Sequence, residues 1–410
     1  MNIDFMLSLV VKATGPILGL FILFFISNQY GKDIVGFYTV LIQVLIFSSV
    51  LIRSGGDFLM IKFAPQLELS TNSEFLKCIF KDMLIGSTVF SIIIYLFFIY
   101  GDYDIEFIQY IAKYQGLFIL SAIVFSVFNL AVSYLVAIQR AKESIVYQSL
   151  LFQLLLLFFY ILLPKKIESI FISITLTSVV LILVIIISKK RLLTSRHSMN
   201  FSGLLKVRLK GFVYAISELL MFNSDLIILS LFVTLSEVAS YALASRVVMM
   251  YGFYVQVQNA YLSGKISNIL TSSNYGLKLK KLFWSTVVVN IAFIFPYLFF
   301  IYAIENIVIT FFSDEYGSLH DYLIIMLGVG VVGIVFGFSV NFFFLISREK
   351  TSFWATQFGL GWSILYVITL MLSTMFYGAL GLAYAVLILK LLYYFLYFGL
   401  NLYYVERIDN

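Results

Sequence analysis

The sequence contains few of the residue types that build disulfides and metal sites. Among its 410 residues there is one cysteine, Cys78, and there are two histidines, His197 and His320. A single cysteine excludes a disulfide within the chain and a cysteine-based metal site. Both histidines fall in predicted loops, so we expect no histidine-rich metal centre. We accordingly expect no bound metal and no cofactor.

Charged residues are also scarce, at 12%, whereas 62% of the residues are hydrophobic. This composition lies outside the range of soluble globular domains. Apolar stretches of about 18 to 25 residues recur along the chain, each long enough to cross a hydrocarbon core about 30 Å thick as a helix. Runs such as "FSIIIYLFF" and "SVVLILVIIIS" do not alternate in polarity, as the strands of a membrane barrel would. The sequence therefore predicts an all-α integral membrane protein.

The apolar stretches predict about twelve crossings. They are Phe5 to Ser27, Phe37 to Met60, Met83 to Tyr100, Tyr114 to Ile138, Ile145 to Leu163, Ile167 to Ser188, Gly211 to Val233, Val238 to Leu262, Leu282 to Ile304, Tyr322 to Ile346, Phe353 to Met375 and Ala379 to Tyr404. With both termini in the cytoplasm, about 21 of the 27 basic residues fall on the inner side and about four outside. This asymmetry favours an even number of crossings.

The loop between the sixth and seventh crossings, "KKRLLTSRHSMNFSGLLKVRLK", is the most basic. A basic loop beside anionic headgroups is ordinary, and we expect no nucleic-acid partner. The loop predicts a six-helix lobe over residues 1–190, a basic cytoplasmic linker over 191–210 and a second six-helix lobe over 211–410.

The two predicted lobes resemble each other in sequence. "YGKDIVGFYTVLIQV" aligns with "VTLSEVASYALASRV", and "IQRAKES" aligns with "ISREKTS". The matches come in the same order with six crossings between the copies, so both halves enter the membrane from the same side. Parallel repeats of this kind are typical of alternating-access transporters, whose substrate site lies between two lobes.

Several segments resemble a known family. The segments "GKDIVGFYTVLIQVLIFSSVLIRSGGDFLMIKFAPQLE", "NSDLIILSLFVTLSEVASYALASRVV" and "YGALGLAYAVLI" are similar to the Wzx-type O-antigen flippases. These belong to the polysaccharide-biosynthesis branch of the multidrug/oligosaccharidyl-lipid/polysaccharide exporter superfamily. The resemblance implies a V-shaped, MATE-like transporter in the bacterial inner membrane. It would move an undecaprenyl-pyrophosphate-linked oligosaccharide from the cytoplasmic to the periplasmic leaflet, beside other polysaccharide-assembly proteins and without hydrolysis.

A pyrophosphate and its sugars need a polar path, since each unpaired polar group in hydrocarbon costs several kcal/mol. Arg246 lies inside the eighth predicted crossing, where a cation is costly, and is the first candidate for binding the pyrophosphate. The same segment supplies Gln256, Gln258 and Asn259 as candidate sugar-binding groups.

Three further cations are candidates for the substrate site. Lys12 and Arg53 lie near predicted helix ends, where the alternative is that they snorkel to the cytoplasmic surface. Lys390 lies in the middle of "AYAVLILKLLYYFLYF", where it would reach either an acidic partner or the cleft.

The seventh predicted crossing carries Glu218, Asn223 and Asp225. The two carboxylates are seven residues apart, which would place both on one helix face about 10 Å apart. One interpretation is a coupling site for H⁺ or Na⁺. The other is that these acids neutralise Arg246 and Lys390, because buried charges are normally paired; an ion pair that opens on protonation would satisfy both.

Two other functions stay open. A cation-coupled antiporter of small molecules would share the fold, whereas a membrane polymerase or glycosyltransferase should carry a longer extramembrane segment with catalytic acids. The segment "GVGVVG" has the spelling of a dinucleotide-binding loop but lies inside an apolar run without a preceding strand. We expect Gly328, Gly333 and Gly337 to allow close helix approach instead, and we expect the protein not to be an enzyme.

Overall fold

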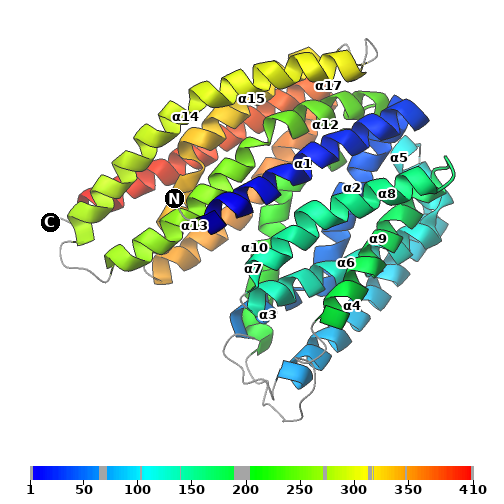
Figure 1. Cartoon of the computed structure of the whole chain (residues 1–410), viewed down its shortest axis with the longest axis horizontal. Coiled ribbons are helices and arrows are strands. Elements are labelled where there is room, and N and C mark those ends of the chain that lie inside the picture. Colours follow the sequence, from blue (N-terminus) through cyan, green and yellow to red (C-terminus); the bar gives the residue numbers. More distant parts are fainter. Residues whose placement is uncertain are drawn as a thin grey trace. The chain divides into compact units, whose positions relative to one another are not determined.

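The computed structural model describes residues 3–63, 72–101, 104–138, 140–188, 204–270, 275–312, 316, 318–346 and 349–407. Within these ranges the chain forms helices joined by short turns, and it forms no strand. Figure 1 shows the helices coloured along the sequence. The prediction of an all-α fold is confirmed.

Eight helical segments in the described part are long and apolar enough to cross a membrane, or nine if one bent pair is counted as a span. One of the eight, Gln357–Glu406, has 50 residues and is too long for a single crossing. It is divided at Gly378, which has φ 62° and ψ −152°. A positive φ favours glycine, which has no Cβ. The break falls between the predicted crossings that end at Met375 and begin at Ala379.

Contacts divide the chain into two compact units, Met1–Ser236 and Glu237–Asn410. The first unit contains α1 (Ile3–Tyr30), α2 (Lys32–Arg53), α3 (Gly56–Phe63), α4 (Asn72–Tyr100), α5 (Glu106–Lys113), α6 (Gln115–Ala137), α7 (Ala141–Ile145), the π-helical turn η2 (Val146–Leu151), α8 (Phe152–Leu162), α9 (Glu168–Ser188), α10 (Leu204–Asn223) and α11 (Asp225–Ser230). In this unit α6 packs against α2, α3 and α9.

The first unit extends beyond the sixth predicted crossing because α10 and α11 pack against α2 and α3. Two glycines allow this approach. A Cβ on Gly211 of α10 would lie 2.5 Å from Cγ of Phe58, and one on Gly55 would lie 2.6 Å from the carbonyl oxygen of Arg208. Residues 189–203, which hold most of the predicted linker over 191–210, lie outside the described residues. The division of the chain at this linker stays a prediction.

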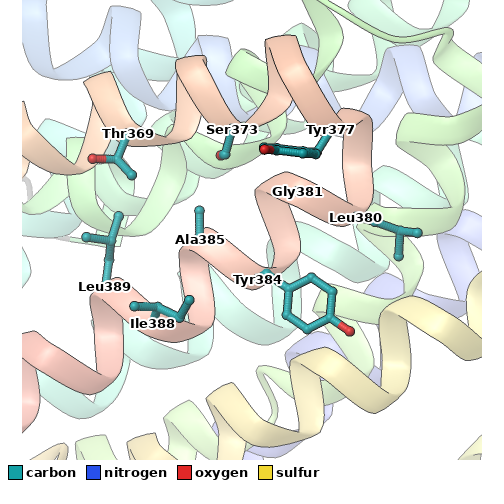
Figure 2. A pocket seen from close by; sticks show the side chains of 9 residues that line it. All are labelled: Thr369, Ser373, Tyr377, Leu380, Gly381, Tyr384, Ala385, Ile388 and Leu389. Atoms are coloured by element: carbon teal, nitrogen blue, oxygen red, sulfur yellow. The ribbon is translucent and has the colours of Figure 1, made fainter.

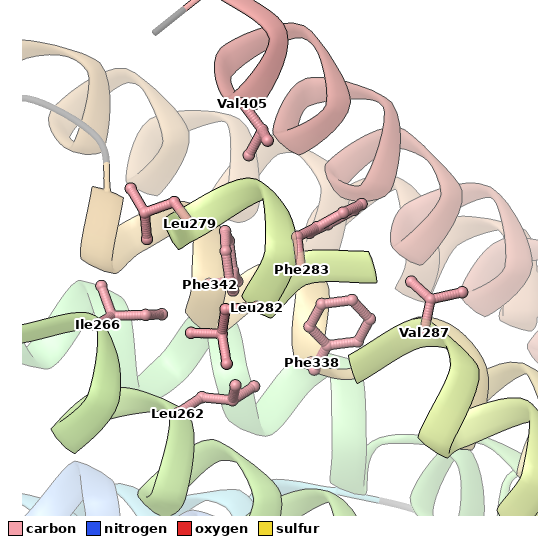
Figure 3. Packing of buried hydrophobic residues seen from close by; sticks show 9 residues of the cluster. All are labelled: Leu262, Ile266, Leu279, Leu282, Phe283, Val287, Phe338, Phe342 and Val405. Carbon is pink, nitrogen blue, oxygen red and sulfur yellow. The ribbon is translucent and has the colours of Figure 1, made fainter. Parts of the chain in front are cut away.

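The second unit contains α13 (Tyr251–Leu270), α14 (Tyr275–Phe312), α15 (Leu319–Phe336), α16 (Phe338–Ile346) and α17 (Glu349–Arg407), together with α12 (Leu235–Val248), whose first two residues precede Glu237. Its core cluster joins α13, α14, α16 and α17 through Leu262, Phe283, Phe338 and Val405 (Figure 3). Phe283 and Phe342 meet edge to face, with ring centroids 5.4 Å apart. Aromatic packing of this kind holds helices together where lipid removes the hydrophobic driving force between them.

The glycines of α15 confirm the expectation of close helix packing. A Cβ on Gly328 would lie 3.0 Å from Leu387 of α17, and one on Gly333 would lie 2.1 Å from the ring of Tyr251 in α13. A Cβ on Gly337 would lie 3.3 Å from Val255, also in α13. A side chain at Gly333 would displace the Tyr251 ring, whereas at Gly328 and Gly337 the neighbouring leucine and valine would have to shift by a few tenths of an ångström.

Three predicted crossings are interrupted in the structure. The second stops at Ser54, in the left-handed region with φ 45°, before α3 begins. The seventh is interrupted at Ser224, and the eighth bends by 43° between α12 and α13, whereas α15 and α16 continue as one span through Gly337. Averaged hydropathy did not predict these breaks, because the apolar runs around them dominate the average. The turn-forming residues of "RSGGD" and "NSD" at the second and seventh were the available signal.

Candidate functional site

The break between α10 and α11 lies among the predicted ion-coupling residues. Asn223 ends α10 and is half-buried, and Asp225 begins α11 with only 4% of its surface exposed. The Asp225 carboxylate accepts a hydrogen bond of 2.9 Å from the backbone N–H of Leu226. A buried carboxylate at a helix break resembles the way transporters build ion sites from discontinuous helices.

Glu218 has a different environment from Asp225. It lies on α10, more than one turn before the break, and its side chain is exposed. Ser224 separates α10 from α11, so the two carboxylates lie on successive helices. That they share one face stays a prediction.

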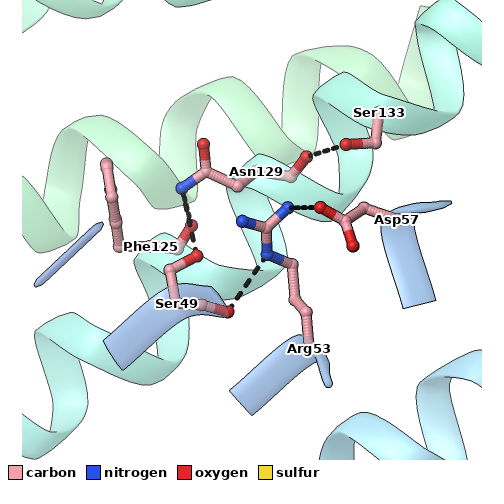
Figure 4. Close-up of polar contacts among 6 residues, drawn as sticks. All are labelled: Ser49, Arg53, Asp57, Phe125, Asn129 and Ser133. Carbon is pink, nitrogen blue, oxygen red and sulfur yellow. Dashed lines mark hydrogen bonds and ion pairs between the residues drawn. The ribbon is translucent and has the colours of Figure 1, made fainter. Parts of the chain in front are cut away.

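Arg53 has partners within the first unit. Its Nη1 lies 2.8 Å from Oδ2 of Asp57, and its Nε donates to the carbonyl oxygen of Ser49 at 3.1 Å (Figure 4). The side chain is 9% exposed, which argues against the alternative that Arg53 snorkels to the surface, and its role in substrate binding stays a prediction. Asn129 of α6 donates to the hydroxyl of Ser49 and to the carbonyl oxygen of Phe125, which links this ion pair to α6.

A second ion pair joins α10 to α4. Arg208 pairs with Asp82, and its Nε donates to the carbonyl oxygen of Ser54 at 2.8 Å. That carbonyl belongs to the left-handed residue between α2 and α3. The two arginines thus hold both sides of the break after α2, and Arg208 is a residue that sequence reasoning did not select.

Gln258, a predicted sugar-binding residue, belongs to a polar cluster of α13 and α14. Its amide nitrogen donates to Oδ1 of Asn290 and to the hydroxyl of Tyr254. Tyr254 also donates to Oδ1 of Asn290 at 2.7 Å, and Asn290 donates to the carbonyl oxygen of Val335 in α15. The ring of Tyr254 stacks on Phe293 with centroids 3.9 Å apart. This Tyr254–Gln258–Asn290 cluster combines amides, a hydroxyl and stacked rings.

Further amides hold the neighbouring helices. Asn341 of α16 donates to the carbonyl oxygen of Asn259 and to the hydroxyl of Ser263, both at 3.3 Å. Asn401 of α17 donates to the carbonyl oxygen of Ser339 at 2.7 Å. Sequence reasoning missed Asn290, Asn341 and Asn401. The available signal was an asparagine inside a long apolar run, such as "VVVNIAFIF", because a buried amide needs partners.

The remaining predicted site residues are dispersed. Arg246 lies in the last turn of α12 and is half-buried, whereas Gln256 on α13 is exposed. Lys390 lies in the second arm of α17 and is only 2% exposed, so it requires compensating groups around it. The side chain of Lys12 lies outside the described residues. The roles of all these residues in binding or coupling stay predictions.

A groove of about 540 Å³ runs beside the turn at Gly378, between the two arms of α17 (Figure 2). Its lining is apolar even where hydroxyl residues contribute. Thr369 and Ser373 donate their hydroxyls to Leu365 and Leu370 of their own helix, so these groups are not offered to a ligand. Tyr377 and Tyr384 also line the groove, so its free polar groups are limited to phenol hydroxyls, and it offers no charged side chain to a phosphate.

The described residues contain no group of three or more His, Cys, Asp or Glu side chains placed to hold a metal ion.

No protein-family model matches the chain, and no curated protein matches its sequence. Solved structures do match. The lipid II flippase MurJ in an inward closed conformation superposes with a TM-score of 0.71 at 19% identity, covering 98% of this chain and 87% of that one. The chain has the fold of MATE transporters and MurJ.

Two structures of MATE transporters also match the chain. The Vibrio cholerae MATE transporter VcmN matches with a TM-score of 0.62 at 15% identity, covering 98% of this chain and 97% of that one. A MATE protein in complex with MaL6 matches with a TM-score of 0.61 at 13% identity, over 98% and 96% of the two chains. The MATE/MurJ fold and the apolar helices describe a multi-pass membrane protein.

Proposed function

We propose that the protein is a flippase that moves an undecaprenyl-pyrophosphate-linked oligosaccharide from the cytoplasmic to the periplasmic leaflet of the bacterial inner membrane. The observation that carries this proposal is the similarity to the lipid II flippase MurJ over nearly the whole chain. The resemblance of the sequence to Wzx-type flippases supports the O-antigen class of substrate. Both termini would lie in the cytoplasm, and the two lobes would expose the site alternately.

Tyr254 and Gln258 are half-buried residues of types that bind sugars, and the fully buried Asn290 would position them for a sugar substrate. Amide and hydroxyl groups hydrogen-bond sugar hydroxyls, and aromatic faces stack on sugar rings. Arg246 would bind the pyrophosphate, because a guanidinium forms bidentate hydrogen bonds with phosphate oxygens.

Genetic complementation tests the proposal directly. In a host strain that lacks the gene, the long-chain surface polysaccharide should disappear, while lipid-linked units stay on the cytoplasmic side of the inner membrane. Restoring the gene should reverse both changes. A normal polysaccharide ladder with normal lipid pools would contradict the proposal and favour the small-molecule antiporter, which the MATE structures also support. Drug accumulation in the same strains would then be measured.

Coupling to H⁺ or Na⁺ would use Asp225, Glu218 and Asn223. We expect Asp225→Asn to abolish transport while the protein level stays normal, because Asp225 is buried at the helix break. We expect Glu218→Gln to have a weaker effect, because Glu218 is exposed. The exposed Glu406→Gln serves as a control. Loss of the Asp225→Asn protein from the membrane would instead support a structural ion-pair role.

A further inference from the structure

The outer face of α14 changes from basic to apolar along the helix. The face begins with the exposed lysines Lys278 and Lys281, passes Trp284 and continues through the exposed apolar side chains of Val288, Ile291, Phe295 and Phe299 to Tyr302. Successive members are three or four residues apart, which keeps them on one side of a helix. Phe295 and Phe299 are 77% and 75% exposed, so this side faces away from the rest of the chain.

The length of this face matches one hydrocarbon core. Trp284 and Tyr302 are separated by eighteen positions, or about 27 Å along a helix, against about 30 Å for the core of a bilayer. Aromatic residues at both ends are typical of the two membrane interfaces. Lys278 and Lys281 lie one to two turns beyond Trp284, and this spacing places their ammonium groups at the level of the lipid headgroups.

A third lysine lies at the same level on the neighbouring helix. Leu262 and Ile266 of α13 pack against Leu279 and Phe283 of α14 in the core cluster (Figure 3). Lys265 of α13 lies between these two contacts in sequence, and its Nζ lies 4.6 Å from the centre of the exposed Tyr261 ring. Cations of two adjacent helices therefore lie at a similar depth.

The start of α14 adds to the positive potential. Its first turn carries no acidic residue, and the N-terminal end of a helix is itself positive. The lysines and the positive end of the helix repel each other, whereas the lysines and the helix end would both attract a phosphate group. The arrangement therefore matches an anion that has two hydrocarbon chains to lay along the apolar face.

We propose that Lys278, Lys281 and Lys265 form a binding site for the headgroup of an anionic phospholipid, whose acyl chains lie along the outer face of α14. The site takes a lipid of the surrounding membrane and is separate from the proposed transport substrate. It would hold the second unit at a fixed depth in the leaflet that carries this headgroup.

Native mass spectrometry of the purified full-length protein in nonionic detergent tests this site. The probes are dioleoyl phosphatidylglycerol and dioleoyl phosphatidylcholine, which share their chains and differ in headgroup charge. Each lysine near an anionic headgroup is expected to strengthen binding several-fold, so Lys278→Ala with Lys281→Ala should weaken phosphatidylglycerol binding about 30-fold.

The matched control is Lys165→Ala with Lys166→Ala, which removes two exposed lysines from the other unit. It should leave the affinity for phosphatidylglycerol within about twofold of the parent's, since neither lysine belongs to the proposed site. Lys278→Arg with Lys281→Arg should retain binding, which separates charge from folding. Equal binding of the two lipids by the parent, or equal losses in the two double alanine variants, would overturn the proposal.

Discussion

The contact between Gly330 and Tyr297 provides a sharp test of helix packing in the second unit. A Cβ on Gly330 of α15 would lie 2.0 Å from the hydroxyl oxygen of Tyr297 and 2.7 Å from Cζ. Tyr297 is 4% exposed, and its hydroxyl donates to the carbonyl oxygen of Val248 at 3.1 Å. In Gly330→Ala the hydroxyl must move by at least about 1.4 Å to restore ordinary van der Waals contact at 3.4 Å.

Two costs follow from this displacement. Overpacking costs about 1 to 3 kcal/mol, and losing the hydrogen bond to Val248 costs about 1 kcal/mol more. We expect Gly330→Ala to lower the free energy of unfolding by about 2 to 4 kcal/mol. Circular dichroism of the purified protein, unfolded with increasing dodecyl sulfate in mixed micelles, measures this change.

The control is Gly399→Ala in α17, where a new Cβ meets no atom within 4 Å. This substitution should be neutral or stabilise by up to about 1 kcal/mol, because alanine favours a helix over glycine. In the Tyr297→Phe background, which lacks the hydroxyl, Gly330→Ala should cost at least about 1 kcal/mol less than in the parent. Equal unfolding free energies for Gly330→Ala and Gly399→Ala would refute the close contact.

Three further substitutions test the remaining contacts. Arg53→Ala should lower the free energy of unfolding by about 2 to 3 kcal/mol, because it leaves Asp57 without its partner. Arg140→Ala, which removes the exposed pair with Glu143, should change it by less than about 1 kcal/mol. Chemical unfolding of both variants measures the difference. Asn290→Ala should cost about 1 to 3 kcal/mol, because Tyr254 and Gln258 lose their shared acceptor; an unchanged unfolding midpoint would contradict the cluster. Arg246→Ala should reduce polysaccharide export at normal protein level, and normal export would remove Arg246 from the proposed substrate site.

Composition and hydropathy predicted the secondary structure because burial in lipid leaves the chain few choices. Each backbone group must find a partner within its own segment, so an apolar run of sufficient length becomes a helix. Even the turn at Gly378 fell where two predicted crossings met. The close-packing role of Gly328 and Gly333 was also predictable, since small residues allow helices to approach in a membrane.

The candidate site was less predictable because it depends on contacts between distant segments. Asp225 and Glu218 are close in sequence, but Asp225 is buried against other helices whereas Glu218 is exposed. Its place near a predicted helix end allowed Arg53 to reach the surface, yet the structure pairs it with Asp57 on the next helix and buries it. No helical spacing in the sequence marks the helix breaks, since they are stabilised by partners such as Arg208 that lie more than one hundred positions away.

The packing of α10 on α2 and α3 has a consequence for how the protein is synthesised. A nascent chain that ends at residue 190 lacks Arg208, so Asp82 and the carbonyl of Ser54 have no arginine to bind. The first unit can be completed only after about forty more residues have entered the membrane. Co-expressed fragments should therefore assemble better when the chain is cut beyond α11 than when it is cut in the basic loop before α10. Any quality-control protease that recognises exposed membrane charges would have that interval in which to act.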